Sequence, residues 1–270
     1  MKKKFNKIAG LTLIEILIAI VISSLMMLAM FTSYTIVNST YRQVTDRAKI
    51  SQAGRDLVGQ VLREIRMAGF KYLNDDIAAN DEHNPIKITS GTGLGGTCDK
   101  LEIVYGGVDY DKDKPDGQRY TFTRYKITYE CKNSVQTDGD GFKILKSKHI
   151  WDGSGWTISP GGKADEKLYE DEDVLDYVQD FVFVAHDEKG KIITSSLPYT
   201  PDKDRAFDVR TVDVGLILRS TKEFYKKDKK ASGVIRKIVS LTSGRDIAEE
   251  DKYLRDIITV TANARNVGLE

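Results

Sequence analysis

Four aspartates lie close together in one polar segment, where their carboxylates could bind a calcium ion. They are Asp109, Asp111, Asp113 and Asp116. Oxygen ligands at alternate positions converge on Ca²⁺ in EF-hand loops, which also need Gly at the sixth position and Glu at the twelfth. Here those positions hold Lys114 and Tyr120, so the segment is not an EF-hand. It is either a looser Ca²⁺ site or a solvated acidic turn between strands.

The sequence holds no arrangement of side chains that is typical of an enzyme. Its three histidines, His83, His149 and His186, are far apart and have no partner at the spacing of metal ligands or of a nucleophile and its base. The serine hydrolase, zinc protease and phosphate-loop motifs do not occur. We therefore expect a protein without catalytic activity and, calcium aside, without a cofactor.

A single carboxylate, Glu15, stands within the apolar N-terminal part of the chain. It is the only charged residue between Leu11 and Tyr41. Thr12 and Glu15 have the spacing of a capping box, in which each side chain binds the backbone N–H of the other residue at the start of a helix. A carboxylate in an apolar membrane segment is also costly, so such residues usually have a functional partner. The two roles are compatible.

The residues around Glu15 predict a membrane-spanning helix. Leu11 to Phe31 is a nearly continuous apolar run, long enough to cross ~30 Å of hydrocarbon as a helix. The run is not followed by a small-residue cleavage site of the ordinary secretory kind, and it is preceded by four lysines and no acidic residue. The lysines are Lys2, Lys3, Lys4 and Lys7. We therefore expect a cytoplasmic N-terminus, a transmembrane helix over 11–41 and an extracytoplasmic head over 71–270.

The helix is expected to continue beyond the membrane and to pack on a β-sheet. Residues 42–70 contain no Pro, and their apolar residues recur at helical spacing, with Gly54 and Gly59 as the weakest positions. Further along, runs of β-forming residues alternate with turn residues. The runs are 100–105, 120–131, 142–151, 178–185, 209–219 and 257–265. We predict an α+β fold, with one long N-terminal helix on an antiparallel sheet and a short helix over 246–254.

The two cysteines, Cys98 and Cys131, both fall in the part of the chain that is predicted to lie outside the cytoplasm. Oxidising conditions there allow disulfides to form and persist. We predict that the two cysteines pair. The alternative is two buried free thiols, because the sequence does not give the distance between the Cα atoms.

The start of the chain resembles the signal of type IV prepilins and pseudopilins. Ala9-Gly10 is followed directly by Leu11-Thr12-Leu13-Ile14-Glu15, although Phe is more usual than Leu after the Gly in that family. The resemblance implies that residues 1–10 are a leader, that a prepilin peptidase cuts between Gly10 and Leu11, and that it methylates the new N-terminus of Leu11. It also implies that Glu15 forms an ion pair with the N-terminal ammonium of a neighbouring subunit.

Later segments resemble the PilW-like minor pilins and, less closely, pseudopilin J of type II secretion. They are 63–70, 174–183, 212–220 and 259–266. The resemblance implies a minor pilin that lies in the lipid of the bacterial inner membrane and then joins other minor and major pilins, through an inner-membrane assembly platform, in a type IV pilus on the cell surface. Its place would be the complex that primes or caps the fibre. The alternatives are a pseudopilin J-like subunit of a secretion pseudopilus and a membrane-anchored adhesin or DNA-binding receptor.

The charge balance argues against a nucleic-acid partner. The chain has 41 Lys and Arg against 40 Asp and Glu, a net charge of +1, so it has no global basic field to bind a phosphate backbone. Loss of the four leader lysines would make the balance negative. We expect no nucleic acid among the partners.

Overall fold

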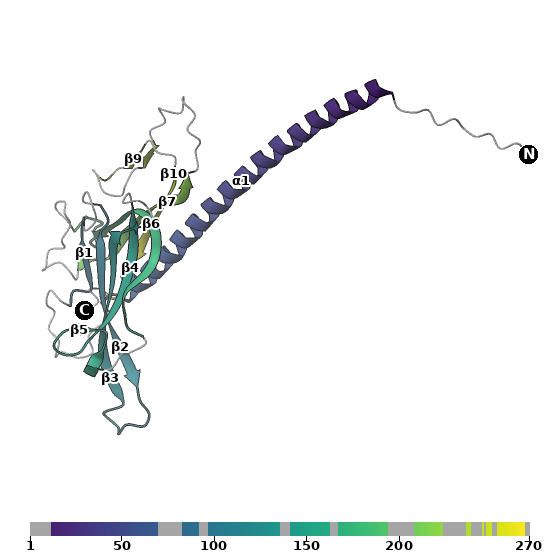
Figure 1. Cartoon of the computed structure of the whole chain (residues 1–270). Coiled ribbons are helices and arrows are strands. Elements are labelled where there is room, and N and C mark those ends of the chain that lie inside the picture. The colour runs from purple at the N-terminus through teal and green to yellow at the C-terminus, as the bar shows by residue number, and fades with distance from the viewer. Residues whose placement is uncertain are drawn as a thin grey trace, which may run out of the picture. The chain divides into compact units, whose positions relative to one another are not determined.

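The computed structural model describes residues 12–69, 83–91, 97–135, 141–162, 167–193, 208–223, 236–238, 245, 247–249 and 253–267. The chain divides into two compact units, Met1–Asp46 and Arg47–Glu270. Each unit is considered by itself below. Figure 1 shows the helix and the strands with the labels used here.

The helix α1 runs from Leu13 to Met67 without interruption, so it covers both the apolar and the amphipathic segments. Two features end the helix after Met67. Gly69 takes a left-handed conformation, with φ of +68°, which a residue with a side chain rarely adopts. The amide of Asn266 also donates a hydrogen bond to the carbonyl oxygen of Arg66, at 3.1 Å, which satisfies one of the helix's last acceptors.

The first part of α1 is suited to a membrane. Within the described residues it is the one helix that is long and apolar enough to cross a bilayer, and that stretch is exposed. Its hydroxyl groups bond back to carbonyl oxygens of the same helix, as Ser24 does to Val21 and Thr32 to Leu28, both at 2.7 Å. Few polar groups would therefore reach hydrocarbon without a partner.

The head is built on one antiparallel sheet with the strand order β1-β2-β3-β4-β6-β7-β10, and β5 pairs with β4 beside this path. The strands are β1 Ile86–Thr89, β2 Lys100–Tyr110, β3 Tyr120–Asn133, β4 Phe142–Trp151, β5 Trp156–Thr157, β6 Tyr169–His186, β7 Thr211–Glu223 and β10 Tyr253–Asn263. A separate two-stranded sheet joins β8 Arg236–Ile238 to β9 Ile247–Glu249. A 3-10 turn lies over Pro160–Gly162.

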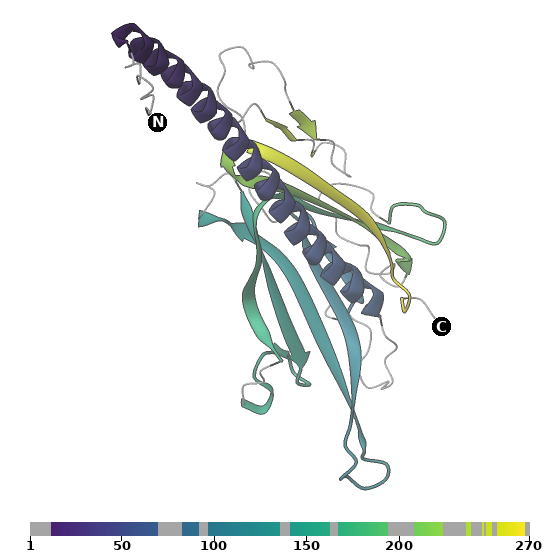
Figure 2. The same ribbon diagram turned by 90° about the vertical axis from the view of Figure 1, so that its right-hand side faces the viewer.

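The amphipathic part of α1 packs across one face of this sheet, as Figure 2 shows. Leu57, Val58, Val61 and Ile65 recur at helical spacing and are buried against the sheet. Apolar side chains of the sheet form the other side of the core. They come from β1 and β2 near the start of the head and from β7 and β10 near its end. The predicted α+β fold, with a long N-terminal helix on an antiparallel sheet, is confirmed.

The two helical glycines differ in their surroundings. A Cβ atom on Gly54 would lie 2.5 Å from Cδ1 of Leu218 and 2.6 Å from Cδ1 of Ile258, whereas a Cβ atom on Gly59 would meet nothing within 4 Å. The helix continues through both positions. Gly54 is therefore the point where the helix axis comes close to β7 and β10.

One sequence expectation about secondary structure is wrong, and one strand is longer than expected. The short helix expected over 246–254 does not form, because 247–249 is strand β9 and β10 begins at Tyr253. Strand β6 begins at Tyr169, nine residues before the predicted start. Its first half is acidic, which disfavours a strand locally, but it pairs with β4. Lys132 of β3 also pairs with Asp171 at 2.5 Å and Lys143 of β4 with Asp173 at 2.7 Å.

Candidate functional site

Glu15 and Thr12 form a reciprocal cap at the start of α1. The backbone N–H and the hydroxyl of Thr12 both donate to Oε2 of Glu15, each at 2.8 Å, and the N–H of Glu15 donates to the Thr12 hydroxyl oxygen at 3.3 Å. The predicted capping box is therefore confirmed. Oε1 of Glu15 accepts no hydrogen bond from any residue that the structure describes, so the carboxylate can cap the helix and still receive another donor.

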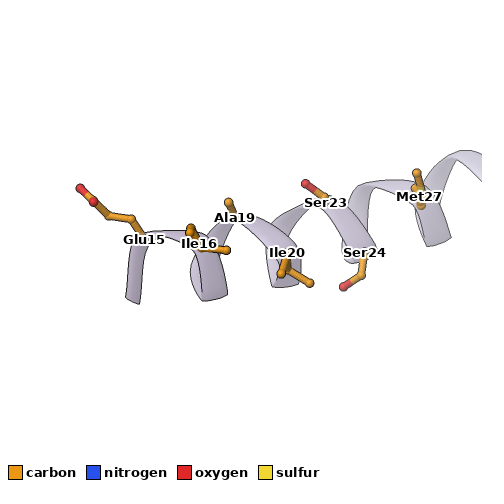
Figure 3. Close-up of a pocket in the computed structure, with 7 residues that line it drawn as sticks. All are labelled: Glu15, Ile16, Ala19, Ile20, Ser23, Ser24 and Met27. Atoms are coloured by element: carbon orange, nitrogen blue, oxygen red, sulfur yellow. The ribbon is translucent and has the colours of Figure 1, made fainter. Parts of the chain in front are cut away.

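A shallow groove on the surface of α1 begins at Glu15. It is lined by Glu15, Ile16, Ala19, Ile20, Ser23, Ser24 and Met27. Figure 3 shows the short side chains of Ala19 and Ser23 on one side of the helix, at successive turns after Glu15. Small residues at this spacing let a second helix approach closely in a membrane. Glu15 thus lies at the end of a helix face that is suited to helix packing.

Gly10 and Leu11, the residues expected at the cleavage and methylation site, lie outside the described residues. The structure therefore does not test the cut or the methylation, and both remain predictions. The first described residue is Thr12, which directly follows them.

Cys98 and Cys131 are joined in a disulfide with a Cα–Cα distance of 6.1 Å, so the predicted pairing is confirmed and the free-thiol alternative is wrong. Both residues are buried. Cys131 lies in β3, and Cys98 lies just before β2 in a left-handed conformation with φ of +63°. The bond ties the chain that enters β2 to the neighbouring strand.

Replacing both cysteines with alanine is expected to destabilise the head by about 3–4 kcal/mol, because the unfolded chain loses a closed loop of 33 residues. Thermal unfolding of the oxidised wild type against the Cys98→Ala/Cys131→Ala variant measures the loss. Alkylation of the denatured but unreduced protein should label neither cysteine. Quantitative labelling of both would contradict the pairing.

The acidic segment considered for calcium forms the connection between β2 and β3. Oδ1 of Asp111 accepts a hydrogen bond from the N–H of Asp113 at 3.0 Å, and Asp116 pairs with Arg119 at 2.6 Å. The side chain of Asp109 lies outside the described residues. Among the side chains that are described, no group of three or more His, Cys, Asp or Glu could hold a metal ion. The calcium site therefore stays a sequence prediction without support from these contacts.

A buried polar cluster joins the helix to the sheet. Glu64, 8% exposed, accepts a hydrogen bond from the Tyr129 hydroxyl at 2.5 Å and one from Nζ of Lys146 at 2.6 Å. Burial and the Glu64 carboxylate together raise the pKa of Tyr129 above its ordinary value, so its hydroxyl stays a donor. Burial opposes the charge of Lys146, but the carboxylate outweighs it and the pKa of Lys146 is raised. The cluster thus links α1 to β3 and β4 by charge-assisted hydrogen bonds.

The cluster around Glu64 was not anticipated from the sequence. A signal was present, because Glu64 stands between Val61 and Ile65, on the face of the helix whose other residues are apolar. A charged residue at such a position needs a partner, but the sequence does not say which one. The partners come from β3 and β4, 65 and 82 residues further along the chain.

Comparison with known proteins finds similarity at the N-terminus. Residues 5–31 match the family described as the prokaryotic N-terminal methylation motif, a segment that includes Gly10, Leu11 and Glu15. Among solved structures, the chain is similar to a type IV-like pilin from Thermus thermophilus, with a TM-score of 0.45 and 10% identity over 80% of this chain and 97% of that chain. A search of curated protein sequences finds no match. The chain thus carries a prepilin-type methylation motif at the start of its long helix.

Proposed function

We propose that this chain is a minor pilin of a type IV pilus, which works by assembly and not by catalysis. A prepilin peptidase cuts it between Gly10 and Leu11 and methylates Leu11. It then co-assembles with other minor and major pilins in the complex that primes or caps the fibre. The observation that carries the proposal is the methylation motif over residues 5–31, placed directly on a long helix whose first part is apolar and exposed.

The exposed apolar surface of α1 supports an assembly role. Leu13, Leu25 and Met27 are each more than 60% exposed, as are other large apolar residues of this stretch. Such a surface is stable only in lipid or against other apolar helices. We propose that it lies in the bacterial inner membrane as a single span with a cytoplasmic N-terminus, and that it exchanges lipid for neighbouring helices when the assembly platform adds the subunit to a fibre.

The proposal is tested by mass spectrometry of fibres sheared from the cell surface. The expected result is this chain with N-methylated Leu11 as its first residue. Replacing Gly10 with a bulky residue, as in Gly10→Leu, should block the cut and leave the protein in the membrane at precursor mass. Lys7→Arg, which keeps the charge of the leader, should be processed normally. Recovery of fibre protein that begins at Met1 would contradict the processing step.

A pseudopilin J-like subunit of a type II secretion pseudopilus is the second candidate, because pseudopilins share the motif that Gly10 and Glu15 belong to. The two differ in where the protein is found. A minor pilin is recovered with sheared surface fibres, and its deletion reduces fibre number. A pseudopilin is absent from such fibres, and its deletion blocks secretion of exoproteins. A membrane-anchored adhesin or DNA-binding receptor is less well supported, since an anchor needs neither residue.

A further inference from the structure

Two aspartates and one arginine from distant parts of the chain meet in the interior of the head. Asp99 lies just before β2, Asp180 in β6, and Arg245 between β8 and β9. Asp99 and Asp180 are at most 1% exposed, and Arg245 is 7% exposed. Nη1 of Arg245 lies 2.6 Å from Oδ1 of Asp99, and Nη2 contacts Oδ1 of Asp180. One guanidinium thus bridges two buried carboxylates.

Backbone N–H groups hold both carboxylates in place. Oδ2 of Asp99 accepts a hydrogen bond from the N–H of Phe183 at 3.0 Å, and Oδ1 accepts one from the N–H of Gly91 at 3.1 Å. Oδ1 of Asp180 accepts one from the N–H of Cys98 at 2.8 Å. A buried ion pair offsets its desolvation fully only when all its polar atoms have partners. Among the described residues Oδ2 of Asp180 and Nε of Arg245 have none, so these backbone bonds and the guanidinium offset the desolvation in part. These bonds orient the acids toward the position that the guanidinium occupies.

Arg245 lies between two short strands, β8 and β9. Strands β8 and β9 form a sheet of their own, which within the described residues pairs with no strand of the main sheet. A hairpin of two short strands is marginally stable in water unless it packs against something else. Arg245, which lies between these strands, contacts two carboxylates in the interior of the head.

The disulfide lies directly beside the acids. Cys98 precedes Asp99, donates its own N–H to Asp180 and is bonded to Cys131 of β3. Cys98 also has a left-handed backbone, which is unfavourable for a residue with a side chain. Without the disulfide, this segment could relax to a more favourable conformation and carry the N–H of Cys98 and the carboxylate of Asp99 out of position.

We propose that Asp99, Asp180 and Arg245 form a clasp that fixes the β8–β9 hairpin to the head, and that the Cys98–Cys131 disulfide keeps the two aspartates in the arrangement that binds Arg245. Arg245 is a positioning residue in this device. Strands β8 and β9 thus stay attached to the oxidised head and are released when either the clasp or the disulfide is lost. The inference does not depend on the proposed role in fibre assembly.

Hydrogen exchange of the full-length protein in detergent, measured by mass spectrometry, tests the clasp. Because Arg245→Met alone leaves two buried carboxylates without a cation, a charge-neutral variant is needed beside it: Asp99→Asn with Asp180→Asn and Arg245→Met. In both, amides of Ile247–Glu249 should exchange at least about tenfold faster than in the wild type. In the neutral variant, amides of Phe181–His186 in the centre of the sheet should keep their protection. Arg265→Met, which removes an exposed arginine after β10, should change neither region.

The link to the disulfide is tested by a double-mutant cycle. Cys98→Ala with Cys131→Ala should speed exchange in β9 as Arg245→Met does, and the combined variant should be little faster than either, because each change releases the same hairpin. Unchanged exchange in β9 after loss of Arg245 would overturn the clasp. Effects that simply add would overturn its link to the disulfide. Equal loss of protection in β9 and in Phe181–His186 in the charge-neutral variant would show that the three residues stabilise the whole head and not the hairpin.

Discussion

Replacing Glu15 with alanine is expected to reduce the amount of this protein in sheared fibres by at least about tenfold, since a charge that loses its buried partner is strongly penalised. Membrane insertion, cleavage after Gly10 and folding of the head should be unchanged, because none of them needs the carboxylate. In the fibre, we expect the carboxylate to meet the N-terminal ammonium of Leu11 on a neighbouring subunit, in an environment of low dielectric constant. Immunoblots of fibre and membrane fractions measure the distribution.

Glu15→Gln separates the two roles of the side chain. Glutamine serves in a capping box as glutamate does, so the bonds to Thr12 can be kept while the charge is lost. If the charge is needed, Glu15→Gln should be missing from fibres as Glu15→Ala is. If capping is the whole role, Glu15→Gln should assemble normally and Glu15→Ala should lose only the modest stabilisation of a helix cap, about 1 kcal/mol. Wild-type levels of Glu15→Ala in fibres would contradict the ion pair.

Replacing Gly54 with alanine is expected to destabilise the head by about 2–3 kcal/mol and to lower its Tm by roughly 5–10 °C. The new methyl group would lie 2.5–2.6 Å from side-chain atoms of Leu218 and Ile258, far inside van der Waals contact. Both contacts are terminal methyl groups in the packing between helix and sheet, so either these side chains must leave their positions or the helix must move away from β7 and β10. Thermal unfolding followed by circular dichroism measures the change.

Gly59→Ala is the matched control, since it makes the same chemical change in the same helix. Nothing lies within 4 Å of the added methyl group, so only helix propensity acts. The head should become more stable by about 0.5–1 kcal/mol. If Gly54→Ala stabilised the head as Gly59→Ala does, the close approach of helix and sheet at Gly54 would be wrong.

The sequence alone determined those features that depend on neighbouring residues. The apolar run after Leu11 predicts a membrane helix, and the spacing of apolar residues after residue 42 predicts its amphipathic continuation, which the single helix Leu13–Met67 confirms. The capping box needs only Thr12 and Glu15, three residues apart. The disulfide could be predicted because there are only two cysteines to pair.

Tertiary structure decided the features in which a residue's behaviour depends on a partner far along the chain. The acidic start of β6 has low strand propensity, and it becomes a strand because β4 pairs with it, while Lys132 and Lys143 form ion pairs with two of its aspartates. Glu64 tolerates burial because Tyr129 and Lys146 reach it. In both cases the local sequence is unfavourable for the observed structure. The partners that compensate for it come from other strands, far away in the chain.

Dependence on distant partners also explains why Gly54 was expected to be a weak point and why Arg245 was not singled out from the sequence. A glycine in a helix is a weak point by local propensity, yet at Gly54 the missing side chain is what lets β7 and β10 approach. Arg245 looks like any surface arginine until the fold brings Asp99 and Asp180 to it, 146 and 65 residues earlier in the chain. Propensity and periodicity are properties of adjacent residues, whereas close packing and buried charge pairing exist only after distant segments have met.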